Sequence, residues 1–87
     1  MKTKLLLVED EVRLATVLKT FFEKESFSVE IVSDGEDALF QAESLKPDII
    51  LLDWMLPNMS GLEICRQIRS TKDLKTTPII FLTAKGE

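Results

Sequence analysis

The chain has 87 residues, of which 45% are hydrophobic and 30% charged, a composition typical of one folded domain spanning residues 1–87. Its formal net charge of −4 argues against direct nucleic-acid binding by this domain, since phosphate contacts need clustered Lys and Arg. The absence of histidine excludes histidine-based catalysis and histidine metal sites. The first apolar run is too short for a signal peptide or a membrane span, so we expect a cytoplasmic protein without membrane contacts.

The chain begins with a predicted strand and helix. Residues 4–8, which are apolar after Lys4, predict a buried strand that ends at the carboxylates of Glu9 and Asp10. From residue 11 to about residue 25, apolar residues recur at helical spacing and predict a helix that packs on a sheet. The expected packing stripe consists of Leu14, Val17, Leu18 and Phe21.

The next predicted elements are an outer strand and a second helix. Residues 28–32 alternate between polar and apolar, which favours an outer strand. Asp34 is the expected N-cap of a second helix, because its carboxylate can accept from free amides of the first turn. Lys46-Pro47 ends that helix, since the residue before proline is pushed away from helical geometry. The expected helix face consists of Ala38, Leu39, Ala42 and Leu45.

Two further apolar runs predict buried strands. Residues 49–52 are wholly apolar and end at Asp53, and residues 79–82 end at Thr83. Between them, Ser60 and Glu63 form a capping-box pattern that predicts a helix from residue 61 to about residue 70. The single cysteine, Cys65, lies in this helical pattern, and packing is a better explanation than a reactive or metal-binding thiol.

Strand and helix patterns alternate, which predicts an α/β fold: a doubly wound parallel sheet with helices on both faces. The carboxyl ends of the strands in such a sheet face one crevice. Glu9, Asp10, Asp53 and Thr83 should therefore converge.

Three carboxylates in one crevice repel each other, and a hard divalent cation such as Mg²⁺ (or Mn²⁺) would relieve the repulsion. With the hydroxyl of Thr83, such a site suits a phosphoryl group on Asp53, the nucleophile of an acyl phosphate. Simpler roles stay open. Asp53 could be a turn aspartate, Glu9 and Asp10 could cap the first helix, and Thr83 could be an ordinary strand residue.

These motifs resemble the receiver domain of two-component response regulators over nearly the whole chain. The resemblance is carried by Val8-Glu9-Asp10-Glu11, Pro47-Asp48 with the run to Asp53, Met55-Leu56-Pro57 with Gly61, and Leu82-Thr83-Ala84. It implies a flavodoxin-like fold with strand order 2-1-3-4 and a phosphorylation-dependent signalling switch that controls an output such as transcription.

The resemblance also implies residue roles. Asp53 would accept the phosphoryl group from a sensor histidine kinase, in a domain that catalyses its own phosphorylation and dephosphorylation rather than acting as a conventional enzyme. Asp10 would bind Mg²⁺ directly, Glu9 through water and Met55 through its backbone carbonyl. The implied switch residue is Thr83, and the implied loop-shaping residues are Pro57 and Gly61.

A complete receiver domain, by the same resemblance, continues with a fifth strand that carries a lysine, and with two further helices. The chain ends at Glu87, so we expect the edge of residues 79–82 to find a partner in a homodimer or swapped assembly. An output domain or partner protein is also implied. The alternative functions are an interaction or folding fragment that cannot be phosphorylated productively, and, more weakly supported, an Mg²⁺-dependent phosphohydrolase.

Overall fold

A computed structural model describes residues 2–56 and 59–82, so the expectations for Pro57 and Thr83 lie outside the described residues. No helix within these two ranges is long and apolar enough to cross a membrane. In chain order the elements are β1 (Thr3–Val8), α1 (Val12–Lys24), β2 (Phe27–Val32), α2 (Gly35–Leu45), β3 (Ile49–Asp53), α3 (Gly61–Arg69), the short 3-10 helix η1 (Lys72–Leu74) and β4 (Ile79–Leu82).

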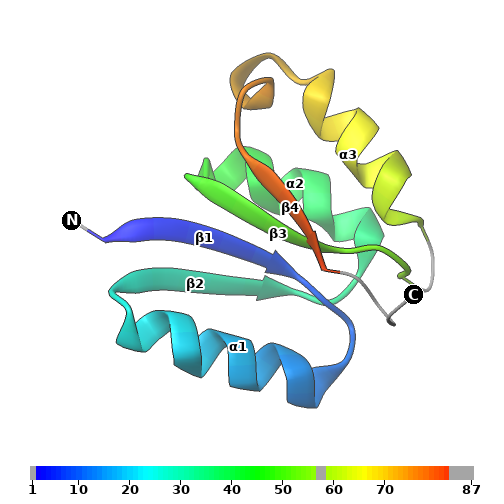
Figure 1. The fold of residues 1–87 in the computed structure, drawn as a ribbon. Coiled ribbons are helices and arrows are strands. Elements are labelled where there is room, and N and C mark those ends of the chain that lie inside the picture. Colours follow the sequence, from blue (N-terminus) through cyan, green and yellow to red (C-terminus); the bar gives the residue numbers. More distant parts are fainter. Residues whose placement is uncertain (1, 57–58, 83–87) are drawn as a thin grey trace.

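The four strands form one parallel sheet in the order β2-β1-β3-β4 (Figure 1). This confirms the predicted flavodoxin-like α/β arrangement and its strand order. β1 and β3 are the inner strands, and the alternation of strand and helix makes each connection a crossover. The two strands that end in acidic residues therefore lie side by side at the centre of the sheet.

Two apolar cores lie on opposite faces of the sheet, because successive side chains of a strand point to opposite sides. On β1, Leu6 and Val8 join the core beneath α2 and α3, whereas Leu5 and Leu7 join the core beneath α1. Figure 1 shows α1 alone on one face, with α2 and α3 on the other. All four of these β1 side chains are almost completely buried, as predicted for this strand.

The predicted packing stripe of α1 is wrong for three of its four residues, and only Leu18 packs on the sheet. Val17 and Phe21 are 64% and 55% exposed, and Leu14 is also exposed. The inward stripe consists of Ala15, which is buried, with the partly buried Leu18 and Phe22. Apolar residues occupy two adjacent stripes of this helix, so periodicity alone could not decide which of them faces the sheet.

Side chains cap all three α-helices. Glu11 caps α1, where its Oε1 accepts from the N–H of Leu14 at 2.9 Å, so neither Glu9 nor Asp10 is the N-cap. The remaining caps confirm the sequence prediction. Asp34 Oδ1 accepts from the N–H of Glu36 at 2.9 Å, and Ser60 Oγ accepts from the N–H of Glu63 at 3.2 Å.

β4 is less buried than its apolar sequence predicted. Its four residues are partly buried except Ile80, which is 50% exposed. Within the described residues β4 pairs with β3 alone, and α1 packs mainly on β2 at the other side of the sheet. On the sheet face that bears Ile80, α1 therefore covers the side of β2 and leaves β4 uncovered.

Candidate functional site

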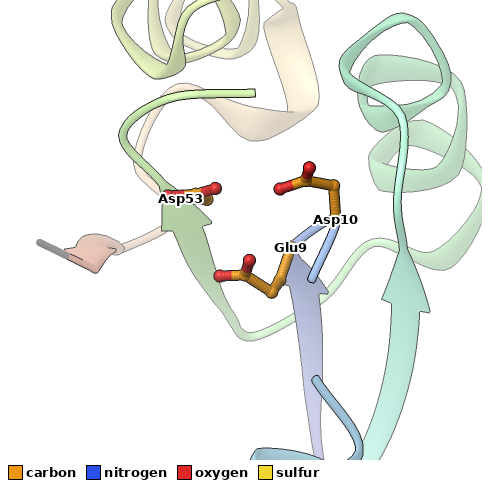
Figure 2. A group of neighbouring side chains, drawn as sticks. All are labelled: Glu9, Asp10 and Asp53. Atoms are coloured by element: carbon orange, nitrogen blue, oxygen red, sulfur yellow. The ribbon is translucent and has the colours of Figure 1, made fainter. Parts of the chain in front are cut away.

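Glu9, Asp10 and Asp53 meet at the carboxyl end of the two inner strands (Figure 2). The register of β1 and β3 pairs Val8 with Leu52, so the residues that follow them emerge next to each other. One carboxylate oxygen from each of the three acids lies within 4.8 Å of the other two. The predicted convergence of these three carboxylates is confirmed.

Asp53, the last residue of β3, places a buried carboxylate in the cluster. Its side chain is only 7% exposed, and its Oδ1 accepts from the backbone N–H of Met55 at 3.3 Å. Burial raises the pKa of the Asp53 carboxyl, and the neighbouring Asp10 raises it further, while the N–H of Met55 opposes the shift. The ionised carboxylate of Asp53 would therefore be stabilised by a bound cation, and its charge would be removed by a proton.

Glu9 is buried as well, at 4% exposure. Its Oε2 accepts from the N–H of Glu11 at 3.0 Å, and its own N–H donates to the carbonyl of Val32 at 2.9 Å. Burial raises the pKa of the Glu9 carboxyl, with further contributions from Asp53 and Asp10, and the bond from Glu11 opposes the shift. Asp10, by contrast, is exposed to solvent.

The loop after Asp53 is tied to the start of α3. The N–H of Gly61 donates to the carbonyl of Trp54 at 2.9 Å, and Met55 forms an isolated antiparallel bridge with Ser60. A side chain at Gly61 would collide with the backbone, since an added Cβ would lie 2.6 Å from the carbonyl oxygen of Asp53. This close approach needs a glycine, and it holds the backbone on both sides of Met55 near the acidic cluster.

An aromatic pair lies beside the candidate site. Trp54 follows Asp53 directly, and its ring meets that of Phe81 on β4 edge to face, with centroids 5.2 Å apart. No local sequence pattern pairs these two side chains. Their contact depends on the register of β3 with β4, in which Asp53 is the partner of Leu82.

The donor set fits a hard divalent cation. Three carboxylates converge, two of them are buried, and the cluster lacks the nitrogen and sulfur ligands that zinc favours. Burial and the nearby negative charges make the Glu9 and Asp53 carboxylates stronger ligands for a cation than they would be alone in water. The expected ligand role of the Met55 carbonyl stays a prediction.

Comparison with known proteins gives a family to this fold and site. A sequence model described as the response regulator receiver domain matches residues 5–87. The chain therefore belongs to the receiver domain family of two-component response regulators.

Individual relatives agree with this assignment. The chain is 52% identical to the response regulator ArlR of Staphylococcus saprophyticus over 85 residues, which is 98% of this chain and 37% of that protein. It is 43% identical to the transcriptional regulatory protein ResD of Bacillus subtilis, covering 99% of this chain and 35% of ResD. The chain thus spans little more than a third of the length of these relatives.

A solved structure supports the fold. The receiver domain of the sensor histidine kinase PA1611 from Pseudomonas aeruginosa PAO1, with a magnesium ion coordinated in its active-site cleft, has a TM-score of 0.92 and 35% identity. The match covers 98% of this chain and 70% of that chain. The predicted homodimer through the β4 edge gains no support from these comparisons.

Proposed function

We propose that this domain is a phosphorylation-dependent switch in which Asp53 accepts a phosphoryl group from the phosphohistidine of a sensor histidine kinase. The observation that carries the proposal is the convergence of Glu9 and Asp10 on a buried Asp53 at the carboxyl end of β3. Family membership supports it, and the name of the transcriptional regulatory protein ResD supports a transcriptional output through a further domain or partner.

In the proposed reaction a carboxylate oxygen of Asp53 attacks the phosphorus of the donor. The new O–P bond replaces the P–N bond to the donor imidazole, which leaves with the bonding electron pair and takes up a proton. The N–H of Met55, 3.3 Å from Oδ1, helps to orient the nucleophile. Dephosphorylation then returns the free Asp53 carboxylate when water attacks the phosphorus.

Asp10, Asp53 and the Met55 carbonyl would hold Mg²⁺ (or Mn²⁺) directly, and Glu9 would hold it through water. The cation would supply positive charge where negative charge develops on the transferring phosphoryl oxygens. The PA1611 receiver domain, whose cleft coordinates magnesium, supports this part of the proposal. The negative charges of Glu9 and Asp10 repel an anionic phosphoryl group, so attack by Asp53 would be disfavoured unless a cation offsets those charges.

The signal would then pass through loops at the same edge of the sheet. Thr83 is proposed to turn toward the phosphoryl group, and Pro57 and Gly61 to shape the loop after Asp53. Phosphorylation would bias an equilibrium between two loop arrangements, which a partner or output domain reads. A cytoplasmic location fits this role and stays a prediction.

The test is incubation of the chain with Mg²⁺ and acetyl phosphate, followed by intact-mass measurement. We expect a mass gain of one phosphoryl group in the wild type and none in Asp53→Asn. Asp48→Asn is the matched control, because Asp48 precedes β3 and binds the backbone N–H of Lys4 at 2.8 Å, away from the acidic cluster. A wild-type mass that never changes would favour the fragment alternative, and turnover of added phosphoesters would favour a phosphohydrolase.

A further inference from the structure

We propose that Arg69 is a positioning residue for the acceptor site, because it holds the connector between α3 and β4 and so sets the register of β4 against β3. The connector is defined as residues 71–78. The inference rests on the proposed function only where it concerns phosphorylation, since the register itself can be measured independently.

Arg69 is the last residue of α3, and its guanidinium reaches along the connector. Nη1 donates toward the carbonyl oxygens of Leu74 at 3.3 Å, Lys75 at 3.0 Å and Thr77 at 2.7 Å. A single charged nitrogen thus gathers three carbonyls from a segment with little regular structure. Charge-assisted bonds of this kind are shorter and stronger than those between neutral groups, and they restrain the path of the backbone.

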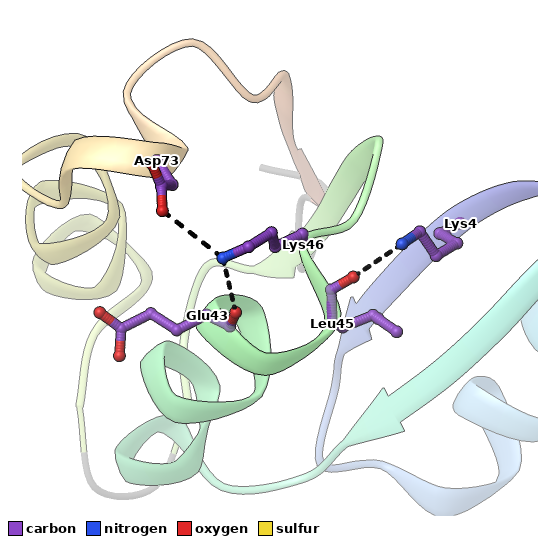
Figure 3. Close-up of polar contacts among 5 residues, drawn as sticks. All are labelled: Lys4, Glu43, Leu45, Lys46 and Asp73. Carbon is purple, nitrogen blue, oxygen red and sulfur yellow. Dashed lines mark hydrogen bonds and ion pairs between the residues drawn. The ribbon is translucent and has the colours of Figure 1, made fainter.

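Other side-chain contacts hold the connector nearer to its start, where the Thr71 hydroxyl donates to the carbonyl of Gln67 at 2.9 Å. Leu74 is 1% exposed and packs in the core beneath α2 and α3. Lys46, at the end of α2, forms an ion pair with Asp73 at 3.5 Å and donates to the carbonyl of Glu43 at 3.3 Å (Figure 3). The ion pair is more than half exposed and contributes little. Among the side-chain contacts of the connector within the described residues, that of Arg69 is the one that reaches Thr77, the last residue before Pro78.

The path from the connector to the acceptor is short. The carbonyl of Pro78 accepts from the N–H of Ile50 at 2.9 Å, where the ladder between β3 and β4 begins. The same register ends with Asp53 opposite Leu82. A one-residue slip of a strand moves each side chain to the other face of the sheet, so a displaced connector would change what stands beside Asp53.

The contact between Trp54 and Phe81 reports on that register. Phe81 belongs to β4 and Trp54 follows the acceptor, so a change in the pairing of β4 alters the surroundings of the indole. Trp54 is the chain's one tryptophan, which makes its emission a specific signal. None of the candidate metal ligands belongs to β4, and Glu9 and Asp10 follow β1, which does not pair with β4, so Mg²⁺ affinity should depend much less on Arg69 than the phosphorylation rate does.

The experiment compares Arg69→Met with Arg66→Met in the full 87-residue chain. Arg66 is the matched control, since it lies one turn earlier on α3 and its side chain pairs with the exposed Glu63 at 3.0 Å. For Arg69→Met we expect the β4 amides to exchange about tenfold faster with deuterium, while β1 and β2 amides keep their protection. The emission of Trp54 should shift, the rate of phosphorylation by acetyl phosphate should fall at least about threefold, and Mg²⁺ affinity should stay within about twofold.

Arg69→Lys guards against a simple folding defect. It keeps the charge and can bind fewer carbonyls, so its exchange and phosphorylation rates should fall between those of the wild type and Arg69→Met. Wild-type exchange in β4 for Arg69→Met would overturn the inference, as would faster β4 exchange with a phosphorylation rate equal to that of Arg66→Met. If the wild type takes up no phosphoryl group, the proposed function fails, while the exchange and emission data still decide whether Arg69 sets the register.

Discussion

Gly61, the first residue of α3, lies against the backbone of Asp53, where an added Cβ would come within 2.6 Å of the carbonyl oxygen of Asp53. We expect Gly61→Ala to force the loop and the strand end apart, with a loss of about 1–3 kcal/mol in the free energy of unfolding and weaker Mg²⁺ binding. Urea unfolding and a Mg²⁺ titration measured through Trp54 emission would check this.

Gly35→Ala is the control for that substitution, since Gly35 is likewise the first residue of its helix, α2. There an added Cβ would lie 3.0 Å from Ile64 Cδ1, the movable end of a side chain, and 3.1 Å from Met59 Cβ, contacts less severe than the 2.6 Å approach at Gly61. The stability loss should therefore be smaller and Mg²⁺ binding should be retained. Equal losses of stability and Mg²⁺ binding in both variants would contradict the assignment of Gly61 to the site.

Glu9→Gln should stabilise the metal-free chain by about 1 kcal/mol, a gain typical of relieving strain at a functional site. The substitution removes one buried charge from the cluster, while the amide oxygen can still accept from the N–H of Glu11. Thermal unfolding without divalent ions measures the effect. Glu30→Gln, on an exposed position of β2, serves as the control and should change stability little. A destabilised Glu9→Gln would show that the Glu9 carboxylate contributes more through its hydrogen bond than it costs through repulsion.

The stability of the metal-free chain should fall as pH rises above about 4. The pKa values of Glu9 and Asp53 are raised from their ordinary values of 4.5 and 3.8, so the stability linked to them is complete below those ordinary values. It is lost as pH rises through the folded-state values, since the ionised carboxylates are buried near each other. Mg²⁺ prefers the ionised forms, so its stabilising effect should grow over the same range.

Thermal unfolding between about pH 4 and pH 8, with and without Mg²⁺, would measure both trends. The variant that carries both Glu9→Gln and Asp53→Asn removes the two shifted carboxyls and should flatten the metal-free trend. If the double variant keeps the wild-type slope, other groups dominate the pH dependence.

Leu74→Ala should cost about 2–5 kcal/mol, the range for truncating a buried leucine. Leu74 is 1% exposed and lies in the core shared by α2 and α3, although it belongs to a mostly polar connector. Leu62→Ala, at a position on α3 that is 55% exposed, is the control and should cost well under half as much. Chemical denaturation of both variants settles the comparison.

The amino-acid sequence alone determined the order of strands and helices and the class of the fold, because uninterrupted apolar runs and capping residues act locally. It also predicted that Glu9, Asp10 and Asp53 meet, since every parallel strand delivers its carboxyl end to the same edge. These expectations needed no knowledge of how any two side chains pack.

Only the tertiary structure decided which faces and neighbours those elements use. It selected Ala15 rather than Leu14 for the inward side of α1, and it made Leu74 a core residue. Both choices depend on where a helix or connector sits above the sheet, which helical periodicity leaves open because apolar residues occupy more than one stripe. The pairing of Trp54 with Phe81 follows from strand register, a long-range property that no local pattern contains. The reach of Arg69 to Thr77 depends on the path by which the connector folds back along α3, which local patterns do not specify either.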